Sequence, residues 1–220
     1  MKQIFIKKQD KKSLLLFFAG WGMDENIVKN YEVHHADFMI CYDYKTLDFD
    51  KSLIEKYQHI RVLAWSMGVW NAAQVLEGVA CTEATAINGT LFPIDDIMGI
   101  PDKIFQGTLD NFSVATLQKF QKRMCGNQEN YQLFQSVQPK RSVEDLHEEL
   151  KAIQANYEEY TQKRFPWNVA VVGKNDNIFP SQNQLNAWKS VLNVYYDVHH
   201  YDYELFKFLI EDADISAEQD

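Results

Sequence analysis

Short apolar segments alternate with helix-like segments along most of the chain, and this alternation limits the fold more than any other feature. Strands are expected over QIFIKK, SLLLFFAG, FMICYDY, IRVLAWS, ATAING, NVAVVGKND and SVLNVYYDVHH. Helices are expected near Asp24, over about 67–79, from about Ser181, and over YELFKFLIEDA. In the helix from Ser181, the residues Leu185, Trp188 and Leu192 would share one face. Strands that alternate with helices favour a largely parallel sheet covered on both faces, so the expected fold class is α/β.

The segment from about Phe92 to Phe165 interrupts this alternation, because it contains no strong strand-like run. Its longest expected helix is SVEDLHEELKAIQANYEEYTQK, with Ser142 as the N-cap and apolar residues at amphipathic spacing. We therefore expect one domain over residues 1–220. Residues 1–91 and 166–220 would form its core, and residues 92–165 a helical lid insertion.

The composition narrows the classes of protein that this chain can belong to. Its 220 residues, 46% of them hydrophobic, suit a single compact domain, which we expect to be a monomer. The net charge of −9 argues against general binding of nucleic acid, which depends on neutralised phosphates. The three cysteines lack the spacing of disulfides or metal sites, and no stretch is long enough to span a membrane. These features indicate a cytoplasmic protein with reduced thiols.

A single serine, Ser66, lies between an expected strand and an expected helix in the stretch RVLAWSMGVW. This is the context of a nucleophile elbow, a sharp turn that needs small residues two positions before and after the serine. Ala64 and Gly68 meet that need. The next amide, that of Met67, would lie at the helix N-terminus and can stabilise an oxyanion. The alternative is a structural serine that hydrogen-bonds a nearby carbonyl.

A serine nucleophile needs a base and an acid that orients the base, and both types of residue follow later in the chain. Asp176 comes after one late strand, and the pair His199 and His200 comes after the next. The order Ser, Asp, His is the one found with nucleophile elbows. The alternative makes Asp176 a turn residue and both histidines surface groups. Near the first strands, the Gly20-Trp21-Gly22 turn can direct the Trp21 amide to the same oxyanion, or it simply turns the chain.

Six segments carry a resemblance to the α/β-hydrolase superfamily: FFAGWGMD, CYDY, RVLAWSMGVW, AINGT, GIPDKIFQGTL and HYDYELF. Over nearly its whole length, the chain resembles more closely the BioG-type pimeloyl-acyl-carrier-protein methyl ester esterases of biotin biosynthesis. This resemblance implies an α/β-hydrolase fold with a mostly parallel central sheet, flanking helices and a helical lid. It also implies a carboxylesterase that removes the methyl group from a pimeloyl ester on acyl carrier protein, without a metal or organic cofactor.

The same resemblance implies a role for each matching residue. The nucleophile falls on Ser66, the acid on Asp176, the base on His200 and the oxyanion amides on Trp21 and Met67. His200 is favoured over His199 because the base of the family directly precedes an aromatic residue, here Tyr201.

Acyl carrier proteins are acidic, so an enzyme with a negative net charge needs local positive charge to bind one. The insertion offers basic candidates for carrier docking: Lys119, Lys122, Arg123, Lys140, Arg141, Lys163 and Arg164. The alternative is that they are ordinary solvated charges. Candidates for the substrate-binding walls are aromatic, and core packing is their alternative role: Trp21, Trp65, Phe112, Phe120 and Phe134.

Two rival functions remain compatible with the sequence. The same triad would serve an acyl hydrolase or thioesterase that acts on another acyl substrate. A hydrolase fold can also act as a non-catalytic binding module, although the intact Ser66, Asp176 and His200 argue against this. Turnover of short p-nitrophenyl esters separates an enzyme from a binding module.

Overall fold

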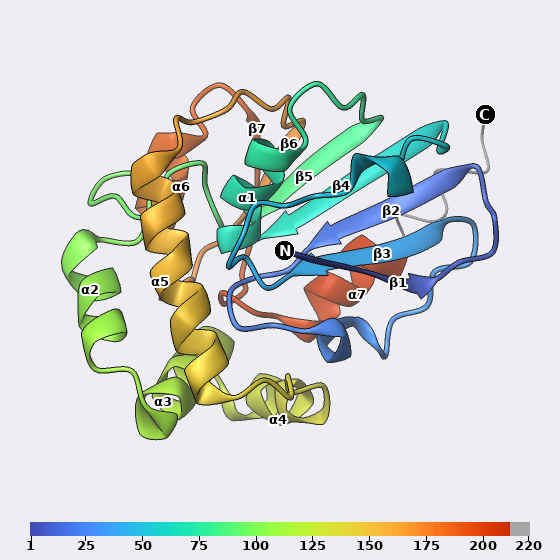
Figure 1. The fold of residues 1–220 in the computed structure, drawn as a ribbon. Coiled ribbons are helices and arrows are strands. Elements are labelled where there is room, and N and C mark those ends of the chain that lie inside the picture. Colours follow the sequence, from blue (N-terminus) through green and yellow to red (C-terminus); the bar gives the residue numbers. More distant parts are fainter. Residues whose placement is uncertain (212–220) are drawn as a thin grey trace.

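The computed structural model of the chain describes residues 1–211, and it confirms the α/β fold class. Within these residues, seven strands form one sheet in the order β1-β3-β2-β4-β5-β6-β7 (Figure 1). Only β1 runs antiparallel to its neighbour. The strands are β1 (Lys2–Lys7), β2 (Ser13–Phe18), β3 (Asp37–Tyr42), β4 (His59–Trp65), β5 (Glu83–Ile87), β6 (Val169–Gly173) and β7 (Leu192–Tyr196).

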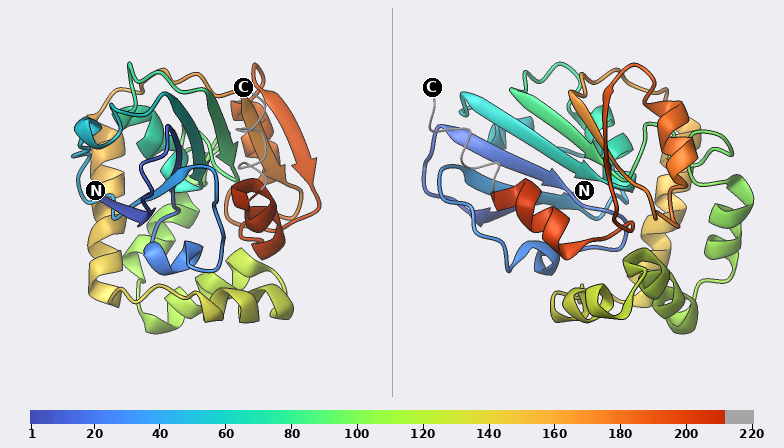
Figure 2. Two further views of the ribbon diagram at one scale, coloured as in Figure 1. Left: turned by 90° about the vertical axis from the view of Figure 1, so that its right-hand side faces the viewer. Right: turned by 180° about the vertical axis from the view of Figure 1, so that it is seen from behind.

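The central strands are continuous apolar runs because helices cover both faces of the sheet. Every residue of β3 is buried, as is every residue of β2 after Ser13. Helices α1 (Met67–Val75) and α7 (Tyr203–Glu211) lie on opposite sides of the sheet (Figure 2). On the α7 side, the Phe206 ring packs edge-on against the rings of Phe17 and Trp65. On the other face, α1 packs against β2 and β4, so the core lies on both sides of these strands.

Four helices lie between β5 and β6 in the chain, where the insertion was expected. They are α2 (Asp102–Asp110), α3 (Val114–Cys125), α4 (Gln128–Ser136) and α5 (Val143–Glu159). Figure 1 shows α2, α3 and α4 outside the sheet, while the long α5 runs from their level to that of α6 (Ser181–Ala187). Leu146, Leu150 and Ile153 form the buried stripe of α5. The division into a core and a lid at residues 92 and 165 stays a prediction.

Several expected elements differ from the observed ones. The helix after Ser66 ends at Val75, earlier than the expected end near residue 79. The stretch near Asp24 forms a short 3-10 helix, η1 (Glu25–Val28), and a second such turn is η2 (Lys51–Leu53). Leu192 was expected on the face of α6, but it begins β7, where it pairs with Val169 and is exposed. The closing helix is described to Glu211, so the expected Asp212 and Ala213 lie outside the described residues.

None of the helices within residues 1–211 is both long and apolar enough to cross a membrane.

The start of α5 provides a test of the insertion's local stability. The Ser142 hydroxyl accepts a hydrogen bond from the Asp145 amide, which confirms Ser142 as the N-cap. We expect Ser142→Ala to lower the free energy of unfolding by about 1 kcal/mol, because one amide of the first turn loses its acceptor. Urea unfolding followed by circular dichroism measures this difference. The control is Ser136→Ala at the exposed end of α4, which removes a hydroxyl that caps no amide. Equal stability of the two variants would contradict the capping role.

Candidate active site

Ser66 occupies a strained turn between β4 and α1. Its φ of 59° and ψ of −128° lie in a region that residues with a side chain rarely adopt. The Ser66 amide donates to the Ile87 carbonyl at 2.9 Å, and the Val69 amide donates to the Ser66 carbonyl at 3.1 Å. The turn is thus fixed by β5 on one side and by the first turn of α1 on the other. It has the geometry of a nucleophile elbow.

Gly68 allows this turn because α1 starts directly against the end of β2. A Cβ atom on Gly68 would lie 2.5 Å from the carbonyl oxygens of both Phe18 and Ala19. Any larger residue would therefore push α1 away from the sheet. This close approach is the physical reason why a small residue is needed two positions after Ser66.

The structure brings Ser66, His200 and Asp176 together at the carboxyl edge of the sheet. The His200 Nε2 atom lies 3.0 Å from the Ser66 Oγ atom, and the His200 Nδ1 atom lies 2.9 Å from the Asp176 Oδ2 atom. Ser66 follows β4, Asp176 follows β6 and His200 follows β7, and all three are buried. With Nδ1 protonated toward the carboxylate, Nε2 is free to accept the serine proton.

The Asp176 carboxylate is held by four donors. Its Oδ1 atom accepts the amides of Ile178 and Phe179, and its Oδ2 atom accepts the Gln184 side-chain amide at 2.9 Å in addition to His200. These four contacts fix the position of the carboxylate beside the imidazole of His200. Gln184 lies on α6 and was not among the expected site residues.

The backbone of His200 is fixed by Asn88, a second residue that the sequence analysis missed. The Asn88 side-chain amide donates to the carbonyls of His199 and His200, and its oxygen accepts the Gly173 amide at 2.7 Å. The Trp65 indole also donates to the His200 carbonyl, at 3.0 Å. Asn88 therefore connects the ends of β5 and β6 with the histidine loop.

The neighbouring His199 does not take part in this chain of contacts. Its Nδ1 atom lies 3.1 Å from the Asn175 carbonyl oxygen, on the loop that follows β6. The structure thus places His200, and not His199, at Ser66.

The two amides expected at the oxyanion belong to residues that line one apolar pocket with Ser66 and His200. Within residues 1–211, neither the Trp21 amide nor the Met67 amide donates to a protein acceptor. Met67 is the first residue of α1, so its amide also carries the positive end of the helix dipole. These amides are the donors that a tetrahedral oxyanion at Ser66 would need.

The expected aromatic wall residues divide into two groups. Trp21, Trp65 and Phe120 line the pocket. Phe112 lies behind Trp21, with ring centroids 5.4 Å apart, and the fully buried Phe134 packs against Tyr201. Phe112 therefore supports the pocket wall without lining it.

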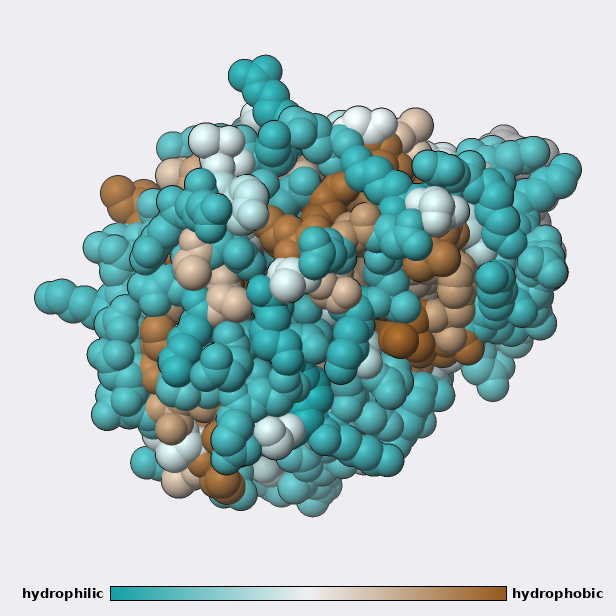
Figure 3. Space-filling view, in the orientation of Figure 1, coloured by the Kyte–Doolittle hydropathy of each residue, from teal (hydrophilic) through white to brown (hydrophobic). Residues whose placement is uncertain are grey.

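The basic candidates for carrier docking differ in their position and in whether their charge is already paired with another side chain. Arg123 lines the catalytic pocket and, with Lys119, an adjoining surface depression. Lys163 pairs with Glu77 at 3.0 Å, while Lys122 stacks over the Tyr131 ring. The face in Figure 3 is mostly hydrophilic, with separate hydrophobic patches.

Arg141 does not fit the expected docking role. Only 6% of its side chain is exposed, and its guanidinium pairs with Asp43, Asp145 and Glu149. The charge is neutralised inside the protein, so we leave Arg141 out of the docking surface.

A mostly parallel sheet with a serine elbow, a histidine and an aspartate at its carboxyl edge defines the α/β-hydrolase fold. The esterase EaEST from Exiguobacterium antarcticum shares this fold at a TM-score of 0.68 and 12% identity, with 99% of this chain and 95% of that chain covered.

A family model and a solved structure of higher sequence identity show which family the chain belongs to. Residues 1–210 match the family described as pimeloyl-ACP methyl esterase BioG. The crystal structure of BioG from Haemophilus influenzae has a TM-score of 0.86 and 38% identity, covering 94% of this chain and 97% of that chain. The chain belongs to the pimeloyl-ACP methyl esterase BioG family.

One curated relative is considerably longer than this chain. A malonyl-acyl-carrier-protein O-methyltransferase from Bacteroides fragilis is 50% identical over 201 residues. The match covers 90% of this chain and 41% of the relative, so this chain spans less than half the length of that protein.

The geometry gives different expectations for the two adjacent histidines. We expect His200→Ala to reduce turnover of an activated ester by several orders of magnitude, because Ser66 loses the ring nitrogen that lies 3.0 Å from its hydroxyl and can accept its proton. His199→Ala should lower turnover modestly, since its ring contacts a loop carbonyl. Steady-state hydrolysis of p-nitrophenyl butyrate by both variants measures the difference. The reverse pattern would move the base to His199.

Proposed function

We propose that this chain hydrolyses the methyl ester of a pimeloyl chain carried on acyl carrier protein, with Ser66 as nucleophile, His200 as base and Asp176 as the orienting acid. The observation that carries the proposal is the hydrogen-bonded chain of Ser66, His200 and Asp176 in a member of the BioG family. The relative from Bacteroides fragilis supports a methyl ester on a carrier, because its name describes O-methylation of a carrier-bound acyl group.

In the first half of the reaction, His200 Nε2 takes the Ser66 proton as Ser66 Oγ attacks the ester carbonyl carbon. The carbonyl oxygen becomes an oxyanion, which the Trp21 and Met67 amides stabilise. Asp176 holds the imidazole in the required tautomer and stabilises its charged form. When the bond between the carbonyl carbon and the methoxide oxygen breaks, His200 Nε2 donates the proton to that oxygen, and methanol leaves.

In the second half, a water molecule takes the place of the serine hydroxyl. His200 accepts a proton from the water as its oxygen attacks the acyl-serine carbon. Collapse of the second tetrahedral intermediate breaks the bond to Ser66 Oγ, and the proton returns to the serine. The product is a free distal carboxylate, while the thioester to the carrier stays intact.

The test is hydrolysis of methyl-pimeloyl carrier by the parent protein and by Ser66→Ala. We expect the parent to release methanol and no carrier thiol, and the variant to be folded but inactive. Loss of a triad member costs on the order of 10⁶-fold in turnover where a comparable triad has been dissected. Mass spectrometry of the carrier reports which bond is cleaved. Release of carrier thiol would indicate a thioesterase, and no turnover of any ester would indicate a binding module.

The proposal includes docking of the acidic carrier on basic residues of the insertion. Lys119 and Arg123 line the surface depression that adjoins the pocket at Ser66, and no acidic residue within positions 1–211 lines it. Lys122 is exposed on the same helix, α3. The remaining candidates are Lys140, Lys163 and Arg164, of which Lys163 is already paired with Glu77. The α3 residues are therefore the strongest candidates for docking.

Charge reversal on α3 tests this docking surface. We expect the double variant Lys119→Glu and Lys122→Glu to raise KM for the carrier substrate at low salt, because encounter with an acidic partner slows. The effect should shrink as the Debye length falls from about 30 Å at 0.01 M salt to about 8 Å at 0.15 M. Hydrolysis of p-nitrophenyl butyrate should stay unchanged. The control is Lys189→Glu, an exposed charge outside the insertion. Equal KM values for the two variants would exclude α3 as the docking surface.

A further inference from the structure

The loop that carries the Trp21 amide is held by the start of α5, a segment more than a hundred positions away in the sequence. The Trp21 indole donates to the Leu146 carbonyl at 2.9 Å. The Gly22 amide donates to the Glu149 carboxylate at 3.2 Å, and the Met23 carbonyl accepts from Arg141 at 3.2 Å. Three successive loop residues thus contact α5 or the residues just before it.

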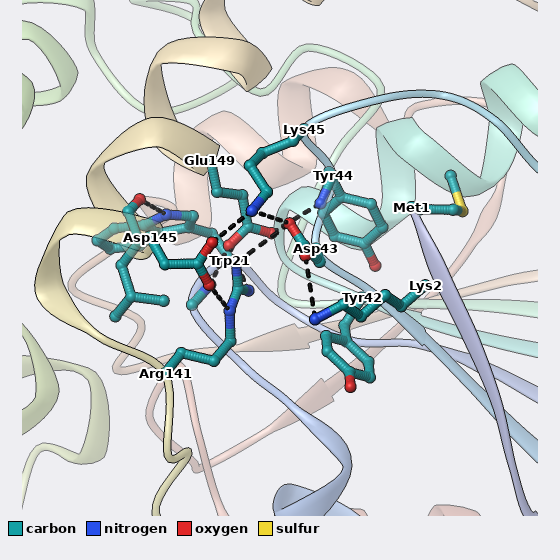
Figure 4. A network of polar contacts seen from close by, with 12 residues as sticks. Met1, Lys2, Trp21, Tyr42, Asp43, Tyr44, Lys45, Arg141, Asp145 and Glu149 are labelled. Carbon is teal, nitrogen blue, oxygen red and sulfur yellow. Dashed lines mark hydrogen bonds and ion pairs between the residues drawn. The ribbon is translucent and has the colours of Figure 1, made fainter.

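Glu149 lies at the centre of these contacts. Its side chain is fully buried, and Figure 4 shows it pointing from α5 toward the loops of Trp21 and Tyr44. One carboxylate oxygen accepts the Tyr44 amide at 2.9 Å. The other accepts both the Gly22 amide and the Arg141 guanidinium, the latter at 2.7 Å. In the part of the chain that the structure describes, every hydrogen bond to this carboxylate therefore comes from a main-chain amide or from Arg141.

The ionised form of a buried carboxylate is costly unless a cation and hydrogen bonds compensate it. Burial raises the pKa of Glu149 above its ordinary value, and the charge of Arg141 opposes that shift. Arg141 also pairs with Asp43 at 3.2 Å and with Asp145 at 2.7 Å, and Lys45 pairs with both of these acids (Figure 4). The network is an extended set of mutually compensating charges built around one guanidinium.

We propose that Glu149 and Arg141 are positioning residues for catalysis: they hold the Gly22 end of the loop and thereby fix the direction of the Trp21 amide toward the oxyanion. This inference rests on the proposed function, because it takes the Trp21 amide as an oxyanion donor. Misaligned donors stabilise the transition state less without changing how the substrate binds. Turnover should therefore depend on the pair, whereas KM should not. A pair that only anchored the insertion would affect stability alone.

The first test compares Glu149→Gln with Glu148→Gln, the same change at an exposed position one residue earlier. In Glu149→Gln, one side-chain acceptor becomes a donor, so the contacts with Gly22, Tyr44 and Arg141 cannot all persist. We expect kcat for p-nitrophenyl butyrate to fall about tenfold or more, approaching the 10²–10³-fold typical of a lost oxyanion donor. KM should stay within about twofold, and Glu148→Gln should match the parent. Expressing kcat per titrated active site removes any contribution from unfolded protein.

A trifluoromethyl ketone, which forms a tetrahedral adduct with serine, gives the second readout. We expect the affinity of Glu149→Gln for this inhibitor to fall by the same factor as its kcat/KM, because both depend on the oxyanion donors. Arg141→Lys, which keeps the charge, should retain more turnover per site than Arg141→Met.

The outcomes separate the two claims. A parent protein that hydrolyses no ester would contradict the proposed function itself. An active parent whose Glu149 and Arg141 variants keep parental kcat and inhibitor affinity per titrated site would overturn only this inference. Variants that contain fewer titratable active sites, but keep parental kcat at each remaining site, would also overturn this inference. That result would mean that the pair only stabilises the insertion.

Discussion

The site depends on the strained backbone of Ser66, which is possible only because neighbouring chain segments approach it without side chains. A Cβ atom on Gly89 would lie 2.3 Å from the Ser66 carbonyl oxygen, and one on Gly68 would clash with the end of β2. Strand β5 and helix α1 therefore fix the turn from both sides. The turn places the buried Ser66 hydroxyl in the pocket at the sheet edge and the Met67 amide at the N-terminus of α1, where our proposal needs an oxyanion donor.

The other two residues of the proposed triad meet Ser66 because parallel strands end at one edge of the sheet. Asp176 and His200 follow β6 and β7, so the loops that carry them start beside each other. Asn88 and Gln184 then fix the two loops with side-chain amides, which satisfy the backbone of His200 and the carboxylate of Asp176. The insertion completes the site from the other side, since its residues hold the Trp21 loop.

Local patterns predicted the α/β fold class and the positions of Ser66, Asp176 and the two histidines after strands, because each of these depends on residues that are close in the sequence. The choice of His200 over His199 came from the family resemblance. The elbow requires only Ala64, Ser66 and Gly68 between a strand and a helix. The buried pairing of Arg141 with Glu149 was missed, since a charged residue in or beside a helix has the same local pattern whether it is exposed or paired inside. The partners of Glu149 could not be found from local patterns, because Gly22 and Tyr44 lie 127 and 105 positions away in the sequence. The helical spacing of Leu192 predicted a place on the face of α6, but its pairing with Val169 of β6 puts it in β7. This pairing also joins residues that are distant in the sequence.

The most direct measurement of the central claim is the identity of the acyl-enzyme formed at Ser66. When a reaction with methyl-pimeloyl carrier is quenched with acid, attack on the methyl ester leaves the whole carrier joined to Ser66 through its acyl chain. Intact-mass spectrometry should then detect an enzyme–carrier conjugate, absent in Ser66→Ala, together with released methanol. An enzyme that carries only a methyl-pimeloyl group, with free carrier thiol, would show attack on the thioester and contradict the account.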